Sequence, residues 1–245
     1  LRFIEQNHNQ PFFLYLPYTI PHAELAVPDD NIMARFRGKF PEEPYSGNDY
    51  GDNFDYGGYC SVENPRAVFA AMVVRLDQYV KEISNKLKEM GIDDNTVVMF
   101  TSDNGPHLEG GADPHFFDSN GPLRGHKRDL YEGGIRVPFI ARWPGTIEPN
   151  RISSHISDFS DFLPTVCDIA GVNIPENIDG ISFLPELKGK EQKSHEYLYW
   201  EFTSAGGKQA IRMGNWKGVK LNINDNPDAP MLLYNLFEDK GEENN

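Results

Sequence analysis

The stretch Thr96–Gly105, with the sequence TVVMFTSDNG, decides the fold class of this chain. Its first part, Thr96–Thr101, is an almost continuous apolar run. A run of this kind is typical of a parallel strand that is buried on both faces. The run ends in Ser102-Asp103-Asn104-Gly105, a sequence that turns the chain.

The segment before this strand predicts an amphipathic helix. Apolar residues recur there at steps of four and three, which places them on one face. Asn64 and Pro65 favour the start of a helix and Gly91 favours its end. A helix followed by a buried strand is the unit of a doubly wound α/β sheet, and ligands bind at the carboxyl ends of its strands. The apolar stripe consists of Val68, Met72, Leu76, Tyr79, Ile83, Leu87 and Met90.

Three further segments fit an α/β body. Phe12–Leu16 predicts a buried strand, Ile135–Trp143 another strand, and Asp161–Ala170 a helix with Pro164 in its first turn. Leu1–Ile4 resembles the end of an amphipathic helix. Because a domain rarely begins within a helix just before a core strand, we expect the chain to be a piece of a longer protein.

The last quarter of the chain has a different pattern. Tyr197–Phe202, Gln209–Met213 and Trp216–Leu221 predict strands, and Gly214-Asn215 is a hairpin turn signal. The polar segment Lys188–Ser194 precedes them as a linker. We therefore expect an α/β domain over residues 1–188 and a small antiparallel subdomain over residues 189–245.

Composition excludes several classes of protein. The chain has 245 residues, of which 39% are hydrophobic and 24% charged, as in globular proteins. No apolar run approaches the roughly 20 residues of a membrane span. The net charge of −14 argues against binding to nucleic acid, whose backbone is itself anionic. The two cysteines, Cys60 and Cys167, are too few for a disulfide framework.

Two clusters of side chains are candidates for chemistry. Asp103 and Asn104 offer the hard oxygen ligands that calcium or magnesium prefers, although Asp-Asn-Gly is also a common turn. Downstream, Gly121–Pro138 places several cations just before the pair Gly133-Gly134. Glycine lets the backbone approach a ligand closely, and cations can neutralise an oxyanion, although a cationic cluster is also common on an ordinary surface.

Several spaced motifs together resemble the formylglycine-dependent sulfatase family of the alkaline-phosphatase-like superfamily. They occur in the family's order and cover most of the chain. The matching segments are Leu16–His22, Phe100–Gly105, Leu123–Lys127, Glu132–Pro138, Ser157–Thr165 and Asp179–Pro185. The resemblance implies the family's α/β sandwich, in part, with a mixed and mostly parallel sheet flanked by helices, followed by the small antiparallel subdomain.

The resemblance also implies roles for four residues. Asp103 and Asn104 match two calcium ligands, and magnesium is the second possible ion. Lys127 matches the lysine that contacts the sulfate, and His22 matches a histidine that reaches the sulfate or the bridging oxygen. These roles fit the chemistry, because a cation and a fixed ammonium oppose the charge that develops as a sulfate ester breaks. A histidine can protonate the leaving alcohol near neutral pH.

Other polar residues in these motifs allow two interpretations. Arg124, His126, His115 and His107 are either substrate contacts or structural residues. We expect Glu132 and Arg136 to form a buried ion pair that shapes the loop. Cys167 is expected in the core, and the surroundings of Cys60 do not suggest a nucleophile.

The family's nucleophile signature, Cys/Ser-x-Pro-x-Arg, is absent from these 245 residues. Two consecutive aspartates that complete the family's calcium site are also absent. In the family both lie upstream of the segment that matches Leu16–His22, so we expect a formylglycine on an upstream residue. On this hypothesis the chain alone is inactive and binds calcium poorly.

The expected substrate is a sulfated carbohydrate or an aryl sulfate. One alternative is a phosphatase or phosphodiesterase of the same superfamily, although Asn104 favours calcium over the transition metals of those enzymes. Another is a sulfoglycan-binding protein that does not cleave its ligand. The family works outside the cytoplasm, and the absence of Asn-x-Ser/Thr sites favours a bacterial periplasm.

Overall fold

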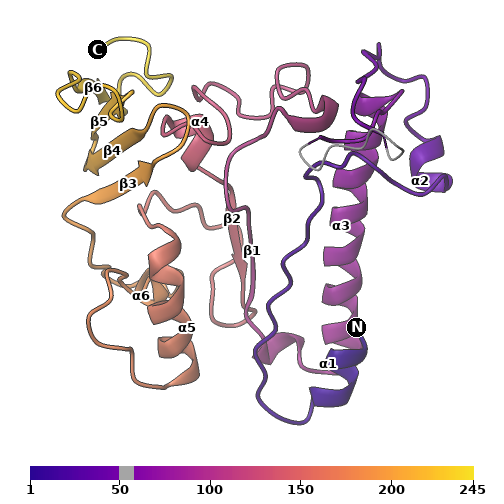
Figure 1. Ribbon diagram of the computed structural model, residues 1–245. Coiled ribbons are helices and arrows are strands. Elements are labelled where there is room, and N and C mark those ends of the chain that lie inside the picture. Colours follow the sequence, from indigo (N-terminus) through magenta and orange to yellow (C-terminus); the bar gives the residue numbers. More distant parts are fainter. Residues whose placement is uncertain (50–57) are drawn as a thin grey trace. The chain divides into compact units, whose positions relative to one another are not determined.

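A computed structural model describes residues 1–49 and 58–245 of the chain. It divides into two compact units (Figure 1). Unit 1 contains Leu1–Asp93 and Pro106–Gly121, and unit 2 contains Asp94–Gly105 and Pro122–Asn245. The candidate clusters around Asp103 and around Lys127 lie in unit 2, whereas His22, His107 and His115 lie in unit 1.

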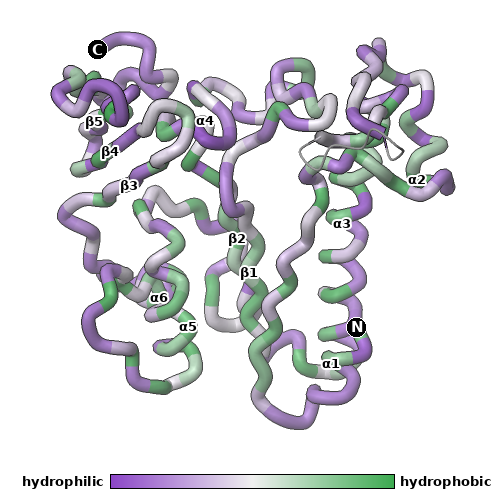
Figure 2. Tube along the Cα trace, viewed as in Figure 1, coloured by the Kyte–Doolittle hydropathy of each residue, from purple (hydrophilic) through white to green (hydrophobic). Residues whose placement is uncertain are grey.

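Unit 1 is built on the long helix α3, Pro65–Glu89. Apolar and polar residues alternate along it (Figure 2), as the sequence predicts. Pro65 occupies the first turn and Gly91, at φ +70°, follows the end, which confirms both expected boundaries. Shorter helices α1, Arg2–Asn7, and α2, Asn31–Ala34, belong to the same unit. Its core consists of Leu25, Met33, Ala67, Val68, Ala71, Met72 and Ala112.

The segment Phe12–Leu16 is not the buried strand that its apolar letters predict. It is extended but pairs with no strand among the described residues, and Phe13 and Tyr15 are 64% and 66% exposed. An apolar run specifies burial only where a partner surface covers it. One side of this segment has such a contact, since the rings of Phe12 and Phe3 lie 5.8 Å apart, whereas Phe13 and Tyr15 stay exposed.

Unit 2 begins with the strand of the deciding stretch. β1, Val98–Thr101, pairs antiparallel with β2, Phe139–Arg142, in the register Val98 with Arg142 and Thr101 with Phe139. The expected parallel pairing of this strand is therefore wrong for the described residues. The predicted strand Ile135–Trp143 is shorter than expected, because its start lies in the helical turn α4, Glu132–Ile135.

Helix α5, Phe162–Ala170, confirms the helix predicted there, with Gly171 at φ +66° ending it. The short 3-10 helix η3, Phe159–Asp161, precedes it and helix α6, Leu184–Leu187, follows. Two further 3-10 helices are η1, Asp93–Asn95, and η2, Glu109–Gly111. Cys167 is 9% exposed on α5, as a core residue should be.

The C-terminal part is a four-stranded antiparallel sheet in the order β3-β4-β5-β6 (Figure 1). Three strands were predicted: β3, Leu198–Phe202, β4, Lys208–Met213, and β5, Trp216–Leu221. The hairpin at Gly214-Asn215 is confirmed by the pairing of Met213 with Trp216. The fourth strand, β6, Leu232–Asn235, was not foreseen. One face of the sheet packs against the residues that precede α4. The shared cluster consists of Leu130, Tyr131, Ala210, Val219, Tyr234 and Leu236.

None of the helices in the described ranges is both long enough and apolar enough to cross a membrane.

Candidate functional site

The turn that follows β1 packs directly on the glycine pair of α4. The backbone nitrogen of Gly105 donates to the carbonyl oxygen of Gly134 at 2.9 Å. A Cβ at Gly105 would lie 1.8 Å from the oxygen of Gly133, so only glycine fits there. This contact brings Asp103 and Asn104 next to the segment that closes the Lys127 loop.

The loop that contains Lys127 closes on the same glycines. Gly133 donates its N–H to the carbonyl oxygen of Arg124 at 2.6 Å. A Cβ at Gly133 would lie 2.4 Å from the oxygen of Gly125, and one at Gly134 would lie 2.5 Å from the oxygen of His126. The glycine pair therefore serves close backbone packing, which fixes the path of the loop around the half-buried Lys127.

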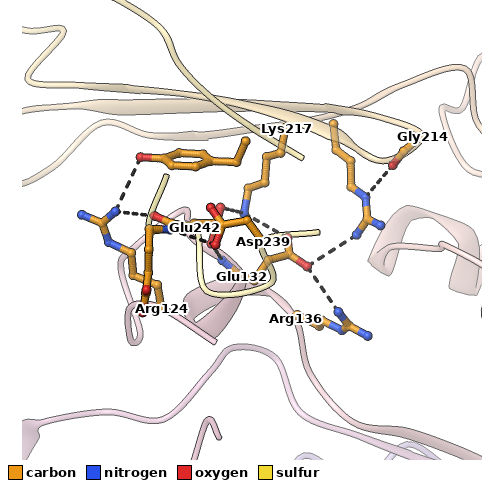
Figure 3. Close-up of polar contacts among 10 residues, drawn as sticks. Arg124, Glu132, Arg136, Gly214, Lys217, Asp239 and Glu242 are labelled. Carbon is orange, nitrogen blue, oxygen red and sulfur yellow. Dashed lines mark hydrogen bonds and ion pairs between the residues drawn. The ribbon is translucent and has the colours of Figure 1, made fainter. Parts of the chain in front are cut away.

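Buried charges hold the end of this loop (Figure 3). Glu132 is 2% exposed and Lys217 is fully buried, and Lys217 Nζ lies 3.0 Å from Glu132 Oε1 and 3.0 Å from Glu242 Oε1. The expected pair of Glu132 with Arg136 exists at 3.7 Å, but Arg136 is exposed. The principal partner of Glu132 is therefore Lys217.

Glu242 connects the C-terminal segment to both ends of the loop. Its Oε2 accepts the backbone N–H of Glu132 at 2.6 Å, and its carbonyl oxygen accepts Nη1 of Arg124 at 2.7 Å. Burial raises the pKa of the Glu242 carboxyl above its usual range, and the ammonium of Lys217 opposes that rise. The guanidinium of Arg124 also lies 4.0 Å from the ring centre of Tyr131, whose pKa burial raises to about 12.

Asp103 and Asn104, which follow β1, have the oxygen atoms that a hard cation prefers, but two such ligands are too few. Asp103 is exposed, and Nδ2 of Asn104 donates to the oxygen of Gly105 at 2.8 Å, which leaves the amide oxygen of Asn104 as the possible ligand. Calcium takes six to eight oxygen ligands. No cluster of three or more acidic, histidine or cysteine ligands occurs among residues 1–49 and 58–245. Asp103 and Asn104 are therefore too few to hold a calcium ion by themselves.

Unit 1 holds a stacked pair of histidines. The rings of His22 and His107 are 5.0 Å apart between centroids and nearly parallel, at 20°. Nδ1 of His22 donates to the carbonyl oxygen of Ala23 at 2.5 Å. His107 is 8% exposed, its Nε2 donates to the oxygen of Pro21 at 3.1 Å, and its Nδ1 lies 3.1 Å from Oε2 of Glu109. His22 therefore stacks on a buried neighbour that Pro21 and Glu109 contact.

His115 lies in the same unit on an exposed loop. The loop is anchored by Asp113, whose Oδ2 accepts Nη2 of the buried Arg66 at 2.6 Å. Hydrogen bonds from Arg66, the main cause, and from the backbone of Phe116 hold the pKa of the Asp113 carboxyl below its usual value. The guanidinium of Arg66 also lies 4.1 Å from the ring centre of Phe116. This is a stable loop, and its geometry assigns no ligand to His115.

The structure thus groups the predicted residues by unit. Asp103, Asn104 and Lys127 lie around one pair of glycines in unit 2, with Arg124 and His126 on the same loop, whereas His22, His107 and His115 lie in unit 1. The contacts of Arg124 favour the structural interpretation of that residue. Sequence reasoning missed the partners Glu109, Lys217 and Glu242, because each lies far along the chain from the motif or outside any motif.

A cavity of about 520 Å³ elsewhere in unit 2 involves none of the predicted residues. Its lining includes His195, whose Nε2 lies 2.7 Å from Oδ1 of the fully buried Asp161. Asp161 Oδ1 also accepts the N–H of Ile181 at 2.6 Å. These contacts connect η3 to the segment before α6 and to the segment before β3, which explains them as structural.

Comparison with known proteins identifies the family. The family model "Sulfatase" matches residues 1–172, and the model "N-sulphoglucosamine sulphohydrolase, C-terminal" matches residues 125–245. The chain belongs to the sulfatase family, which confirms the resemblance and the expected partial α/β fold.

Several curated relatives of the chain are also sulfatases by name. The chain is 35% identical to an uncharacterized sulfatase of Escherichia coli, YdeN, over 78% of this chain and 30% of that protein. It is 32% identical to an arylsulfatase of Hemicentrotus pulcherrimus over 89% of this chain and 33% of that protein. It is 31% identical to an N-acetylgalactosamine-6-O-sulfatase of Bacteroides thetaiotaomicron over 71% of this chain and 37% of that protein. The chain therefore spans about a third of these relatives' length.

Solved structures share the fold. Ps i-CgsB, solved in complex with k-i-k-neocarrahexaose, matches all of this chain and 48% of its own, with a TM-score of 0.76 and 30% identity. A protein solved in complex with its substrate D-glucosamine-2-N,6-O-disulfate matches 75% of this chain and 36% of its own, with a TM-score of 0.61 and 28% identity.

Proposed function

We propose that the protein containing this chain is a sulfuric ester hydrolase that removes sulfate from a sulfated carbohydrate. Membership of the sulfatase family supports the reaction class. The relatives' names support the substrate class, since one is an N-acetylgalactosamine-6-O-sulfatase and another was solved with a disulfated glucosamine as its substrate. An aryl sulfate would serve as a laboratory substrate, as the name of the arylsulfatase relative suggests.

The single observation that carries the proposal is the hydrogen bond from Gly105 to Gly134. It places the Asp103-Asn104 turn and the Lys127 loop on one pair of glycines. In this proposal the ammonium of Lys127 binds the sulfate and opposes the negative charge that grows as the ester bond breaks. Asp103 and Asn104 supply two oxygen ligands of a calcium ion, with magnesium as the alternative, and further ligands come from outside residues 1–245.

His22 is proposed as the proton donor. Because its Nδ1 donates to Ala23, any proton passed to a substrate leaves from Nε2. That proton would go to the bridging oxygen as the sulfur–oxygen bond breaks, so that the sugar leaves as a neutral alcohol. The nucleophile is a formylglycine made from a cysteine or serine outside these residues, since none of them forms the Cys/Ser-x-Pro-x-Arg signature. We further propose an extracytoplasmic location, in a bacterial periplasm.

The test compares two proteins. The chain of residues 1–245 should not hydrolyse 4-nitrophenyl sulfate or a sulfated monosaccharide. The polypeptide that includes the nucleophile segment should hydrolyse both, and K127A should lower kcat/KM by roughly 100-fold, the effect of removing one preorganised charge from an oxyanion site. The variant R128A is a matched control, because it removes the neighbouring exposed cation. Measurable turnover by residues 1–245 alone, or equal losses in both variants, would contradict the proposal.

A further inference from the structure

We propose that His107, held by Glu109, is a positioning residue that fixes the imidazole of His22 for proton transfer to the leaving alcohol. This inference rests on the proposed function of His22. It concerns two residues that the sulfatase motifs of the sequence do not explain. All three side chains lie in unit 1.

A hydrogen bond shows which ring nitrogen of His107 donates. The carbonyl oxygen of Pro21 can only accept, so Nε2 of His107 donates to it at 3.1 Å. Nδ1, on the opposite side of the ring, faces Oε2 of Glu109 at 3.1 Å. The ring of His107 is therefore contacted on both of its nitrogen sides.

The contact between His107 and Glu109 is buried. His107 is 8% exposed, and the side chain of Glu109 is 12% exposed. Side chains packed this closely have little room to move. Phe69 contacts His107 from a further side, with ring centroids 6.4 Å apart. The ring of His107 therefore offers a fixed surface for stacking.

The ring of His22 stacks on the ring of His107. Its ring lies 5.0 Å from that of His107 at an angle of 20°, and Tyr59 lies 6.4 Å from it at 61°. The same His107 also anchors the carbonyl of Pro21, the residue before His22. Both the ring and the backbone of His22 are thus held through one side chain. Precise placement matters for proton transfer, because a small displacement of a catalytic group lowers the rate strongly.

The first experiment is independent of turnover. In residues 1–245 labelled with ¹⁵N at histidine, the two ring nitrogens of His22 should show the single tautomer with Nδ1 protonated that the bond to Ala23 requires. In H107F, which keeps an aromatic ring but loses both ring nitrogens of His107, the two nitrogens of His22 should move towards the averaged shifts of a mobile ring. E109Q should give a smaller change of the same kind. Unchanged His22 shifts in H107F would overturn the proposal.

The second experiment uses the leaving group, in the polypeptide that includes the nucleophile segment. A sugar alcohol is a poor leaving group and needs the proton, whereas 4-nitrophenolate leaves without it. H107F should therefore lower kcat for a sulfated sugar by about 10- to 100-fold, part of the effect typical of general acid catalysis, with KM little changed. The loss for 4-nitrophenyl sulfate should be at most about 3-fold on the same reasoning. Equal losses for both substrates would indicate a merely structural role and overturn the proposal.

Two controls separate the possible failures. D118N removes an exposed carboxylate from the same segment, Pro106–Gly121, and should change neither readout. E109Q keeps the size of the side chain, so it tests the charge if H107F does not fold. If the wild-type protein cleaves no sulfate ester, the proposed function fails, and the ¹⁵N shifts still decide whether His107 positions His22.

Discussion

The ammonium of Lys217 and the carboxylate of Glu132 form an ion pair of 3.0 Å in which Lys217 is fully buried and Glu132 is 2% exposed (Figure 3). Glu242 lies 3.0 Å from the same ammonium on the other side. Lys217 is on β5, and Glu132 begins the turn that ends in the glycine pair of the site. The antiparallel sheet is thereby attached to the loop of Lys127, so the stability of one depends on the other.

Replacing Lys217 by methionine should destabilise the chain strongly. The substitution keeps the apolar stem but removes the ammonium that pairs with Glu242 and leaves Glu132 with its longer contacts, to Arg212 at 3.5 Å and to Arg136 at 3.7 Å. Breaking a buried pair in this way typically costs about 3–5 kcal/mol of the free energy of unfolding. Urea unfolding of K217M and wild type measures this difference.

The matched control is K220M on the same strand, because Lys220 is less buried and its Nζ donates to the oxygen of Pro227 at 3.2 Å. It should change the free energy of unfolding by about 0.5 kcal/mol or less. The triple variant E132Q/K217M/E242Q should recover part of the loss, since it removes the uncompensated charges. If K217M is no less stable than K220M, the buried cluster does not stabilise the loop.

Gly133 should not tolerate alanine. The added Cβ would lie 2.4 Å from the carbonyl oxygen of Gly125 and 2.5 Å from that of Arg124, both of them backbone atoms. The loop must open to admit it, at a cost of about 1–3 kcal/mol by analogy with overpacking. Hydrogen exchange should then speed up over residues 124–132. G241A is the control, because its Cβ would meet its nearest atom at 3.3 Å, and equal exchange in both variants would refute the packing argument.

The pair of Asp113 and Arg66 should make stability depend on pH. Because Arg66 lowers the pKa of Asp113, the folded state favours the carboxylate. The contribution is complete above the ordinary pKa of 3.8 and is lost as the pH falls through the lowered value. D113N should therefore lower the melting temperature at neutral pH by about 2–4 °C. The difference from wild type should shrink below pH 3.8, and a difference that is constant with pH would contradict the assignment.

Calcium should bind residues 1–245 weakly. Asp103 and Asn104 are two oxygen ligands where six to eight are needed, so we expect a Kd above about 1 mM by calorimetry. In the polypeptide with the nucleophile segment, calcium should raise the melting temperature, and D103N should remove most of that rise. D94N, which removes a carboxylate before β1, is the control. Submillimolar binding by residues 1–245 that D103N leaves intact would show that calcium binds elsewhere.

Local pattern predicted the elements whose partners are close in sequence or whose ends are marked. The stripe from Val68 to Leu87 and the signals at Pro65 and Gly91 predicted α3, because helix hydrogen bonds are local. The turn at Gly214-Asn215 likewise predicted the hairpin of β4 and β5. The apolar run before Asp103 predicted β1, but the parallel, fully buried strand expected there is wrong for the described residues, since apolar residue types do not fix the direction of the partner strand.

The sequence by itself determined the family and selected Asp103, Asn104, Lys127 and His22 as candidate site residues, because motif chemistry depends on residue type and spacing. Only the tertiary structure showed why Gly105, Gly133 and Gly134 must be glycine, since Gly105 packs on the distant Gly133 while Gly133 and Gly134 pack on the backbone of the loop that precedes them. It alone revealed the partners Lys217 and Glu242, and the stacking of His22 on His107. These contacts form between segments that are distant in the sequence, so a local sequence pattern does not predict them.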